Sequence, residues 1–563
     1  MKLRTSYFNR TVFFKDITRF FPVWVLYTIG LLLTLVLLDG VSSPTNYAQR
    51  ARDLGDCINI FAVFNCGYAM LCAQLLFGDL YQSRLCNALH AMPLRRETWF
   101  VTHILSGLSF FVIPNLLFAL LTLTFLGNAY FVAGYFLLGV TLPFLFFFGV
   151  AVFSVMCVGN RFAMALVYGI INLLALLVAW IIQSLYQPLL YGITLDLDFL
   201  WHFSPLAEVV GTTYFPLCRT DGPGIFLFEA DGFGYLGIYA GVGVLFGGLA
   251  LALYRRRHLE CAGDFIVVKP LAPIFLILYT LCAGTLLHLF FQLFLGTQMN
   301  FFYIGLLIGY FTGQMLLRRT PNVFKKKVFL GAGVFALAML LSFGITRLDP
   351  LGITRYIPAS DQIESVEVCD FAGYYQKRPY TVTDPKEIDE LSAVHAAAIA
   401  EGRAEEGRLD YFTLVYRLKN GMTVKRSYTI AADGQTAERL VPIFSRPKAV
   451  LYADLDSAEA YADKMQLLYL DIRDTQQKLS GAPLVAFLDA LLLDCEEGSM
   501  VQAWGFHAST TPTIYLSFVY GLPEHPEDVI TEDTHTHTVT IYGDNTHAYR
   551  WLKENGYLLG DMP

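Results

Sequence analysis

Charged residues are scarce in this sequence. Only 15% of its 563 residues are Asp, Glu, Lys or Arg and 55% are hydrophobic, whereas a soluble domain usually has about 25% charged residues. The length alone would allow three or four soluble domains, but a mean hydropathy of +0.49 is too apolar for them. Most of the apolar residues are therefore expected to lie in lipid, which argues against a soluble globular enzyme.

Several signatures of catalysis and cofactor binding are also missing. The dipeptide Gly-Lys does not occur, so the phosphate-binding loop GxxxxGK[ST] is absent. The ten cysteines include no Cys-x-x-Cys pair, and no Ser-His-Asp order or nucleophile elbow is found. We expect a protein that is not an enzyme, has no catalytic or metal site and binds no cofactor directly.

The few charges are divided unevenly at about residue 346. Up to this point 21 Lys and Arg stand against 14 Asp and Glu (+7), and beyond it 19 stand against 33 (−14), which gives the net charge of −7. This division indicates two different environments. The acidic balance of the second part argues against a nucleic-acid partner.

Nine stretches without Asp, Glu, Lys or Arg are candidates to cross a membrane. A helix needs about 20 apolar residues to span about 30 Å of hydrocarbon. The stretches are residues 20–38, 58–77, 104–126, 130–158, 162–182, 236–254, 271–295, 301–317 and 328–345. The first follows a basic segment like a signal peptide, but its length favours a retained anchor.

The orientation follows from the distribution of Lys and Arg, which stay on the cytoplasmic side of a membrane. Residues 1–19, 78–103, 159–161, 255–270 and 318–327 hold 18 of them, and the intervening segments before residue 346 hold three. This ratio predicts a multi-pass protein of the plasma membrane with a cytoplasmic N-terminus. Nine spans would then place residues 346–563 outside the cell.

Polar side chains within the predicted spans are few and none is charged. They are Asn59, Asn65, Gln74, Asn115, Asn172, His288, Gln292 and Gln314. Each is interpreted first as an interhelical hydrogen bond worth about 1 kcal/mol and second as a substrate contact. A carrier driven by protons or ions would usually need ionisable groups at this depth.

Two cytoplasmic segments have a recognisable pattern. Residues 1–19 combine Tyr7, Phe13 and Phe14 with Arg10 and Lys15, which is typical of a helix lying in the membrane interface; the alternative is a short solvated basic tail. In residues 78–103, Leu85, Leu89 and Met92 recur at helical spacing, and Pro93 precedes a second helical run.

The second segment resembles a known family. A Gly78-Asp79 span exit, a short amphipathic helix and Met92-Pro93-Leu94-Arg95-Arg96-Glu97 are similar to the cytoplasmic coupling segment of type-2 ATP-binding-cassette (ABC) exporter permeases. That family shows a small apolar-Pro-x-Ser/Arg-Arg signature there, and the segment docks on a separate ATPase. The resemblance implies coupling roles for Asp79, Arg84, Leu89, Pro93, Arg95, Arg96 and Glu97. Taken singly, Pro93, Arg95 and Arg96 are better explained as ordinary residues of a positively charged cytoplasmic loop, whereas layout and motif together favour the coupling role.

The layout extends the resemblance to residues 1–260. An interfacial helix, six spans and a longer outer segment before the sixth, here residues 183–235 with Phe203-Ser204-Pro205-Leu206, are the family's pattern. Residues 261–345 add three further spans, and residues 346–563 resemble a C-terminal extracytoplasmic domain attached to some Gram-positive permeases. The fold class expected is a polytopic α-helical membrane protein with a C-terminal α+β domain.

In residues 346–563 the alternation of residues predicts strands at 361–371, 411–418, 422–429, 514–520 and 536–542, and helices at 385–401, 457–468, 483–493 and 547–555. Asn420-Gly421 marks a hairpin. His535 and His537 would share one strand face and could hold a metal with Glu532 or Asp533, although a half-solvated face is the simpler interpretation.

Two further features of this region are open. Cys369 and Cys495 could form a disulfide or remain buried thiols. Asp494, Glu496 and Glu497 form an acidic cluster that is expected to face water.

The function expected from these observations is that of the membrane subunit of an ABC exporter. Its partners would be a cytoplasmic ATPase that supplies ATP hydrolysis, a second permease copy or paralogue in a dimer, and the lipid bilayer. Its substrate would be amphipathic, peptide-antibiotic-like or lipid-like. The alternative is a membrane-anchored sensor or scaffold whose extracytoplasmic domain binds a cell-envelope ligand.

Overall fold

The chain divides into two compact units, which are described separately. In the computed structural model, residues 1–185 and 196–341 form a helical unit, and residues 186–195 and 342–563 form an α+β unit. The structure describes residues 7–41, 47–125, 130–195, 197–211, 219–220, 226–227, 233–258, 261–295, 301–369, 380–404, 409–447, 458, 467–472, 477–498, 513–520, 535–542 and 546–558.

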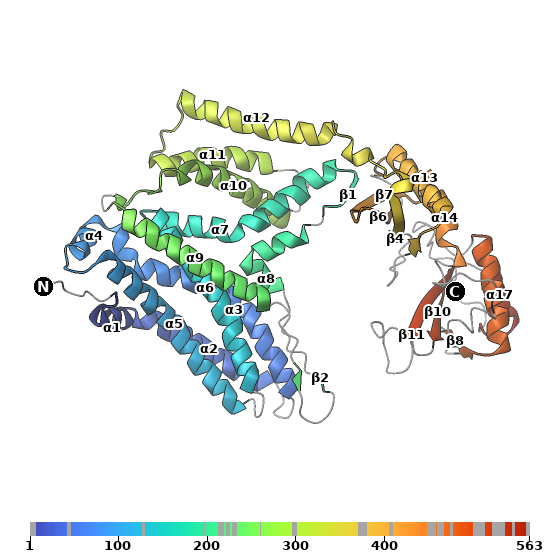
Figure 1. Ribbon diagram of the computed structural model, residues 1–563, viewed down its shortest axis with the longest axis horizontal. Helices are drawn as coiled ribbons and strands as arrows, with labels where there is room; N and C mark the ends of the chain where they lie inside the picture. Colours follow the sequence, from blue (N-terminus) through green and yellow to red (C-terminus); the bar gives the residue numbers. More distant parts are fainter. Residues whose placement is uncertain are drawn as a thin grey trace. The chain divides into compact units, whose positions relative to one another are not determined.

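The helical unit consists mainly of long helices (Figure 1). Its α-helices are α1 (Arg10–Arg19), α2 (Phe21–Val41), α3 (Tyr47–Leu76), α4 (Ser83–His90), α5 (Arg96–Phe125), α6 (Tyr130–Cys157), α7 (Arg161–Ile181), α8 (Pro205–Gly211), α9 (Phe233–Arg256), α10 (Leu271–Leu295), α11 (Phe302–Arg318) and α12 (Lys326–Leu348). A 3-10 turn, η1 (Gly78–Tyr81), precedes α4, and a π-helical turn, η2 (Ile182–Tyr186), continues α7.

Seven of these helices are long and apolar enough to cross a membrane, which makes this a polytopic helical protein. They are α3, α5, α6, α7, α9, α10 and α12. The bent pair of α1 and α2, which meet at 62°, would raise the number to eight. The span predicted at 301–317 corresponds to α11, whose 17 residues would be only about 26 Å long. The count of nine spans is therefore not confirmed.

Glycines allow two pairs of helices to approach closely. A Cβ atom added to Gly149 of α6 would lie 2.1 Å from the carbonyl oxygen of Gly243 in α9. A Cβ added to Gly305 of α11 would lie 2.7 Å from the Cα of Gly284 in α10. Lipid provides no hydrophobic force between helices, so close backbone packing of this kind is a main source of their association. The pairs α6–α9 and α10–α11 are therefore held as tight units.

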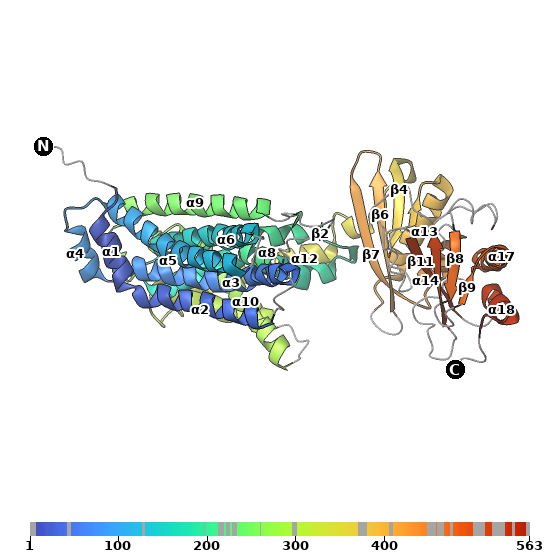
Figure 2. The same ribbon diagram turned by 90° about the horizontal axis from the view of Figure 1, so that it is seen from below.

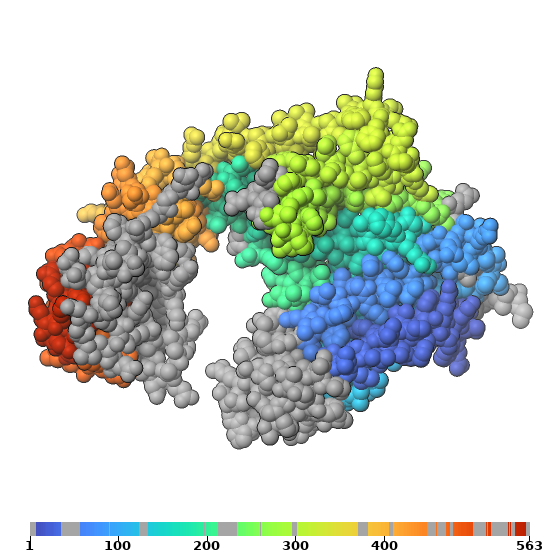
Figure 3. Space-filling view, turned by 180° about the vertical axis from the view of Figure 1, so that it is seen from behind, coloured from blue at the N-terminus to red at the C-terminus, as the bar shows by residue number. Residues whose placement is uncertain are grey.

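Helix α12 is packed differently. Most of its side chains are exposed, with Leu330 at 70% and Leu340 at 66% of full exposure. In Figure 3 its yellow atoms form an outer edge of the helical unit. A helix of this composition satisfies its own backbone groups and needs only lipid around it.

Polar side chains join helices within the apolar core. The Tyr27 hydroxyl on α2 donates to Asn65 Oδ1 on α3 at 2.8 Å, and Asn115 Nδ2 on α5 donates to the same hydroxyl at 3.0 Å. Gln74 of α3 donates to the carbonyl oxygen of Arg161 at 3.2 Å. Asn172 and Gln314 instead bond within their own helices. The bonds of Asn65, Gln74 and Asn115 are interhelical, as the first interpretation expects, whereas among the described residues the buried atoms Asn59 Oδ1 and His288 Nδ1 have no hydrogen-bond partner.

The α+β unit contains two antiparallel sheets. Along the chain, its helices follow or separate the strands. The first has the order β1-β7-β6-β4-β5 and the second β11-β10-β8-β9. The strands are β1 (Gly192–Ile193), β4 (Ile363–Cys369), β5 (Tyr380–Val382), β6 (Leu409–Leu418), β7 (Thr423–Ala431), β8 (Leu467–Ile472), β9 (Gln477–Leu479), β10 (Thr513–Tyr520) and β11 (His535–Tyr542). The helices are α13 (Pro385–Glu401), α14 (Gln435–Phe444), α17 (Ala482–Glu496) and α18 (His547–Glu554).

Most of the predicted elements of this unit are present. The Asn420-Gly421 hairpin joins β6 and β7, and Gly421 takes φ +83°, as a tight turn requires. The helix expected at 457–468 lies largely outside the described residues, and its last two residues begin strand β8 instead. Strands β1, β5 and β9 and helix α14 were not expected from the sequence.

A histidine is buried in the core of the first sheet. His395 of α13 has its Nδ1 2.9 Å from the Tyr416 hydroxyl and its Nε2 2.6 Å from the Tyr428 hydroxyl. Burial, with a smaller effect of the Arg426 charge, lowers the pKa of His395 from 6.5 to about 4. The folded unit therefore holds this ring neutral.

The α+β unit should lose stability as the pH falls from about 6.5 to about 4. In this window the unfolded state binds a proton at His395 and the folded state does not, which costs about 3 kcal/mol in total. Hydrogen exchange of β6 in the full-length protein measures this loss. His395→Gln, which has no titrating group at this position, should show a flatter profile, and an equally steep fall in that variant would contradict the assignment.

Candidate functional site

The five cation-rich segments predicted to be cytoplasmic meet at one end of the helical unit, where Figures 1 and 2 place α1 and α4. Asn9 donates its N–H to the Thr102 hydroxyl at 3.1 Å, which joins the first segment to the second. Gly159 N–H donates to the Asp264 carbonyl at 2.7 Å, and Arg319 pairs with the Asp264 carboxylate at 2.6 Å. We call this end of the unit the cationic end.

Several residues of the predicted coupling segment are exposed at the cationic end. Arg84 and Leu85 lie on α4, and Met92, Pro93 and Arg95 lie in the turn before α5 or at its start. Leu85 is 42% exposed and Met92 46% exposed. Among the residues that the structure describes, no hydrogen-bond or ion-pair partner is found for the side chains of Arg84 and Arg95. Two cations beside exposed apolar side chains are suited to a partner with an acidic and apolar surface. We call these five residues the coupling face.

The next two residues point inward and bind helix α9. Arg96 Nη1 donates to the carbonyl oxygen of Arg257 at 3.0 Å, just beyond the last residue of α9. Glu97 Oε1 lies 3.1 Å from Arg255 Nε. The last carbonyls of a helix have no partner within the helix, and a cation there also interacts well with the helix dipole. Arg96 and Glu97 thus fix the start of α5 to the end of α9.

Arg257 makes the corresponding connection to helix α6. Its Nη1 donates to the carbonyl oxygens of Val155 at 2.9 Å and Met156 at 3.3 Å, and its Nη2 donates to the Leu80 carbonyl at 3.5 Å. The residue is only 7% exposed. Burial lowers the pKa of Arg257 from its ordinary value, but a guanidinium remains protonated in proteins. This side chain joins η1, α6 and the segment after α9.

Helix α1 is attached to the same structure by polar contacts. The buried Asp16 carboxylate accepts from the Ser106 hydroxyl at 3.0 Å and lies 2.8 Å from His103 Nδ1. Arg19 of α1 pairs with Asp79 at 3.8 Å. Tyr7 and Phe14 remain exposed, as expected for an interfacial helix. The burial of Asp16 was not expected, because the basic and aromatic residues around it give no sign of a buried carboxylate.

The predicted coupling residues therefore have different surroundings. Arg84, Pro93 and Arg95 are exposed, Arg96 and Glu97 contact the end of α9, and Asp79 pairs with α1. Leu89 lies within α4, but its side chain is outside the described residues. Sequence reasoning missed Arg257, because the run Arg255-Arg256-Arg257 gives no sign of which arginine is buried.

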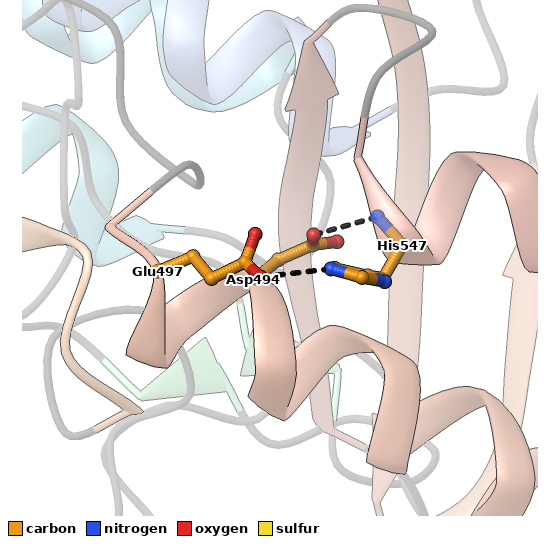
Figure 4. Close-up of side chains that lie close together, drawn as sticks. All are labelled: Asp494, Glu497 and His547. Atoms are coloured by element: carbon orange, nitrogen blue, oxygen red, sulfur yellow. Dashed lines mark hydrogen bonds and ion pairs between the residues drawn. The ribbon is translucent and has the colours of Figure 1, made fainter.

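One group of side chains in the described part of the α+β unit has the composition of a metal site. Ligand atoms of Asp494, Glu497 and His547 all lie within 4.8 Å of one another (Figure 4). The two Asp494 oxygens accept from the backbone N–H groups of His547 and Ala548 at 2.7 and 2.8 Å, at the start of α18. His547 Nε2 lies 3.1 Å from Glu497 Oε1. These bonds explain the group as a junction of α17 and α18.

This result corrects the expectation that the acidic cluster faces water. Glu496 and Glu497 are exposed, but Asp494 is fully buried. A buried carboxylate needs hydrogen bonds, and the N–H groups at the start of a helix supply them.

The other two candidate sites are partly described. His535 and His537 lie on β11, as predicted, opposite Tyr520 and Phe518 of β10, but their side chains and Glu532 and Asp533 are outside the described residues. Cys369 on β4 and Cys495 on α17 are not joined to each other by a disulfide.

Comparisons of the chain with protein-family models, with curated proteins and with solved structures found no match.

Replacing Arg257 should destabilise the cationic end. In Arg257→Ala the carbonyl groups of Val155, Met156 and Leu80 lose charged donors, and we expect a cost of about 2 to 4 kcal/mol. Arg256→Ala is the matched control, because Arg256 is the exposed neighbour in the same run. Thermal unfolding of the purified protein measures both variants. Equal effects of the two substitutions would contradict a special role for Arg257.

Replacing Asp494 should loosen α18. Asp494→Ala removes the acceptors of the His547 and Ala548 N–H groups, although the N-cap Thr546 keeps its bond to Tyr549, and should cost about 1 to 2 kcal/mol; Glu497→Gln affects only an exposed pair and should cost less than about 0.5 kcal/mol. Hydrogen exchange of residues 547–554 measures the change. Protection that increases with added Zn²⁺, and does so only when Glu497 is present, would instead indicate a metal site.

Proposed function

We propose that this chain is the membrane subunit of an ATP-driven ABC exporter and that a cytoplasmic ATPase docks on its coupling face. The observation that carries the proposal is the two-sidedness of the coupling segment. Arg84, Leu85, Met92, Pro93 and Arg95 are exposed, while the next two residues, Arg96 and Glu97, are bonded to the end of α9. A segment with a free face and a fixed face is suited to pass on an applied force.

The sidedness of the protein is part of this proposal. The cationic end holds the segments that carry 18 Lys and Arg of the chain up to residue 346, and such segments resist translocation. The coupling face then lies in the cytosol, where ATP and the ATPase are. The α+β unit, which follows α12, lies outside the cell.

The path of the force follows from the contacts. ATP binding closes the ATPase and displaces the coupling face, Arg96 moves the end of α9, and Arg257 moves the end of α6. Since Gly149 and Gly243 pack α6 and α9 backbone to backbone, these two helices respond as a rigid pair. Such a device suits an amphipathic, peptide-antibiotic-like or lipid-like substrate in a dimeric permease, because none of the predicted spans carries a charged residue.

Reversal of two charges on the coupling face tests the proposal. Arg84→Glu with Arg95→Glu should reduce co-purification of the ATPase about tenfold or more, because two attractive pairs become repulsive. Lys326→Glu with Lys327→Glu is the control, since it makes the same charge change at exposed positions of the cationic end. Arg96 is left intact, because its substitution would also break the contact with α9.

The outcome separates the exporter from the sensor or scaffold. An exporter subunit loses its ATPase in the first variant and keeps it in the control. If the wild-type protein is repeatedly recovered from membranes without any ATPase, the exporter proposal is wrong and the sensor interpretation takes its place.

A further inference from the structure

A short segment between α7 and α8 belongs to the α+β unit. Residues 186–195 group with residues 342–563 although the two are far apart in sequence. Within this segment, β1 forms one edge of the first sheet, with Gly192 opposite Ser427 and Ile193 opposite Arg426 of β7. We call residues 186–195 the strap.

Side-chain hydrogen bonds attach the strap to the first sheet in addition to the backbone pairing of its two strand residues. The Tyr191 hydroxyl lies 2.7 Å from the Gly402 carbonyl oxygen and 3.3 Å from that of Thr429, within reach of donating to either. Arg403 donates to the Pro188 carbonyl at 3.1 Å. Two residue pairs of strand are marginal by themselves, so these contacts make the docking persistent.

The strap also fits closely against the core of the sheet. Gly192 takes φ +78°, and a Cβ atom there would lie 2.3 Å from the Tyr428 ring. Only glycine accepts both the conformation and the close approach. The Tyr428 hydroxyl is in turn bonded to His395, so the strap rests on a fixed part of the core.

Both ends of the strap lead back to the helical unit. Its first residue, Tyr186, lies in the turn that continues α7, and its hydroxyl is 2.7 Å from that of Ser342, which also belongs to the α+β unit. The chain therefore passes between the two units three times, after residues 185, 195 and 341. A domain on one flexible linker would have a single connection.

We propose that the strap couples α7 to the α+β unit, so that movements of this unit are passed directly to the end of α7. This inference rests on the proposed function in one respect only: the signal is taken to be a ligand that the α+β unit captures outside the cell. The strap itself can be tested without an ATPase or a substrate.

The test compares two glycine substitutions in the full-length protein in lipid nanodiscs. Gly192→Val should displace the strap, whereas Gly211→Val, in the same connection but with open space around its Cβ, should not. Spin labels introduced as non-canonical residues at the exposed positions Ser184 and Glu438 report on the distance between the end of α7 and the α+β unit. Tyr191→Phe, which keeps the ring and removes the donor, is the milder second variant.

The expected result has two parts. In Gly192→Val, exchange of the β7 amides should accelerate about tenfold or more and the spin-label distance distribution should broaden, with a smaller change in Tyr191→Phe and none in Gly211→Val. The proposal is overturned if β7 of the wild type exchanges as fast as an unpaired edge. It is equally overturned if the strap detaches while the distance distribution stays unchanged.

Discussion

The carbonyl groups at the ends of α6 and α9 impose the main constraint on the cationic end. The last carbonyls of a helix lack partners within the helix, and away from bulk water they need other donors. Arg257 supplies them for α6 and Arg96 for the end of α9. Arg257 also bonds to Leu80 in η1, and Arg96 is the first residue of α5. The two arginines that satisfy the carbonyl groups therefore also hold both ends of the coupling segment in place.

The helical unit combines tightly paired helices with one, α12, that is largely exposed and contacts α11 mainly through Phe329, Gly331 and Phe335. Glycine contacts hold α6 against α9 and α10 against α11, and a stacked pair of rings, Phe111 and Phe144 at 3.7 Å, packs α5 against α6. Helix α12 is exposed along most of its length. Tight pairs preserve their geometry when a force acts on them, so in the proposed exporter the bundle around α6 would move as one body and α12 would serve as a connection.

The sequence predicted most elements and few contacts. Long uncharged runs give the helices of the spans because apolar length in lipid leaves no alternative, and Asn420-Gly421 gives the hairpin because few turns fit that dipeptide. Uncharged runs do not determine which side chains meet in the folded protein. The burial of Arg257, one of three adjacent arginines, and the contact of Asp16 with His103 could therefore be found only from the structure. Strand β1 was missed for a similar reason, since two residues carry no alternation and depend on a partner more than 200 residues away.

The same distant pairing sets an order for biosynthesis. Gly192 and its partner Ser427 are separated by 235 positions (427 minus 192), and a ribosome adds about 5 to 20 residues per second. The edge of the first sheet thus leaves the ribosome roughly 10 to 50 s before the strand that it joins. During translation Tyr191 and Gly192 have no sheet to join while α8 to α12 are synthesised, and β1 can pair with β7 only after about three quarters of the chain, 427 of 563 residues, has been made.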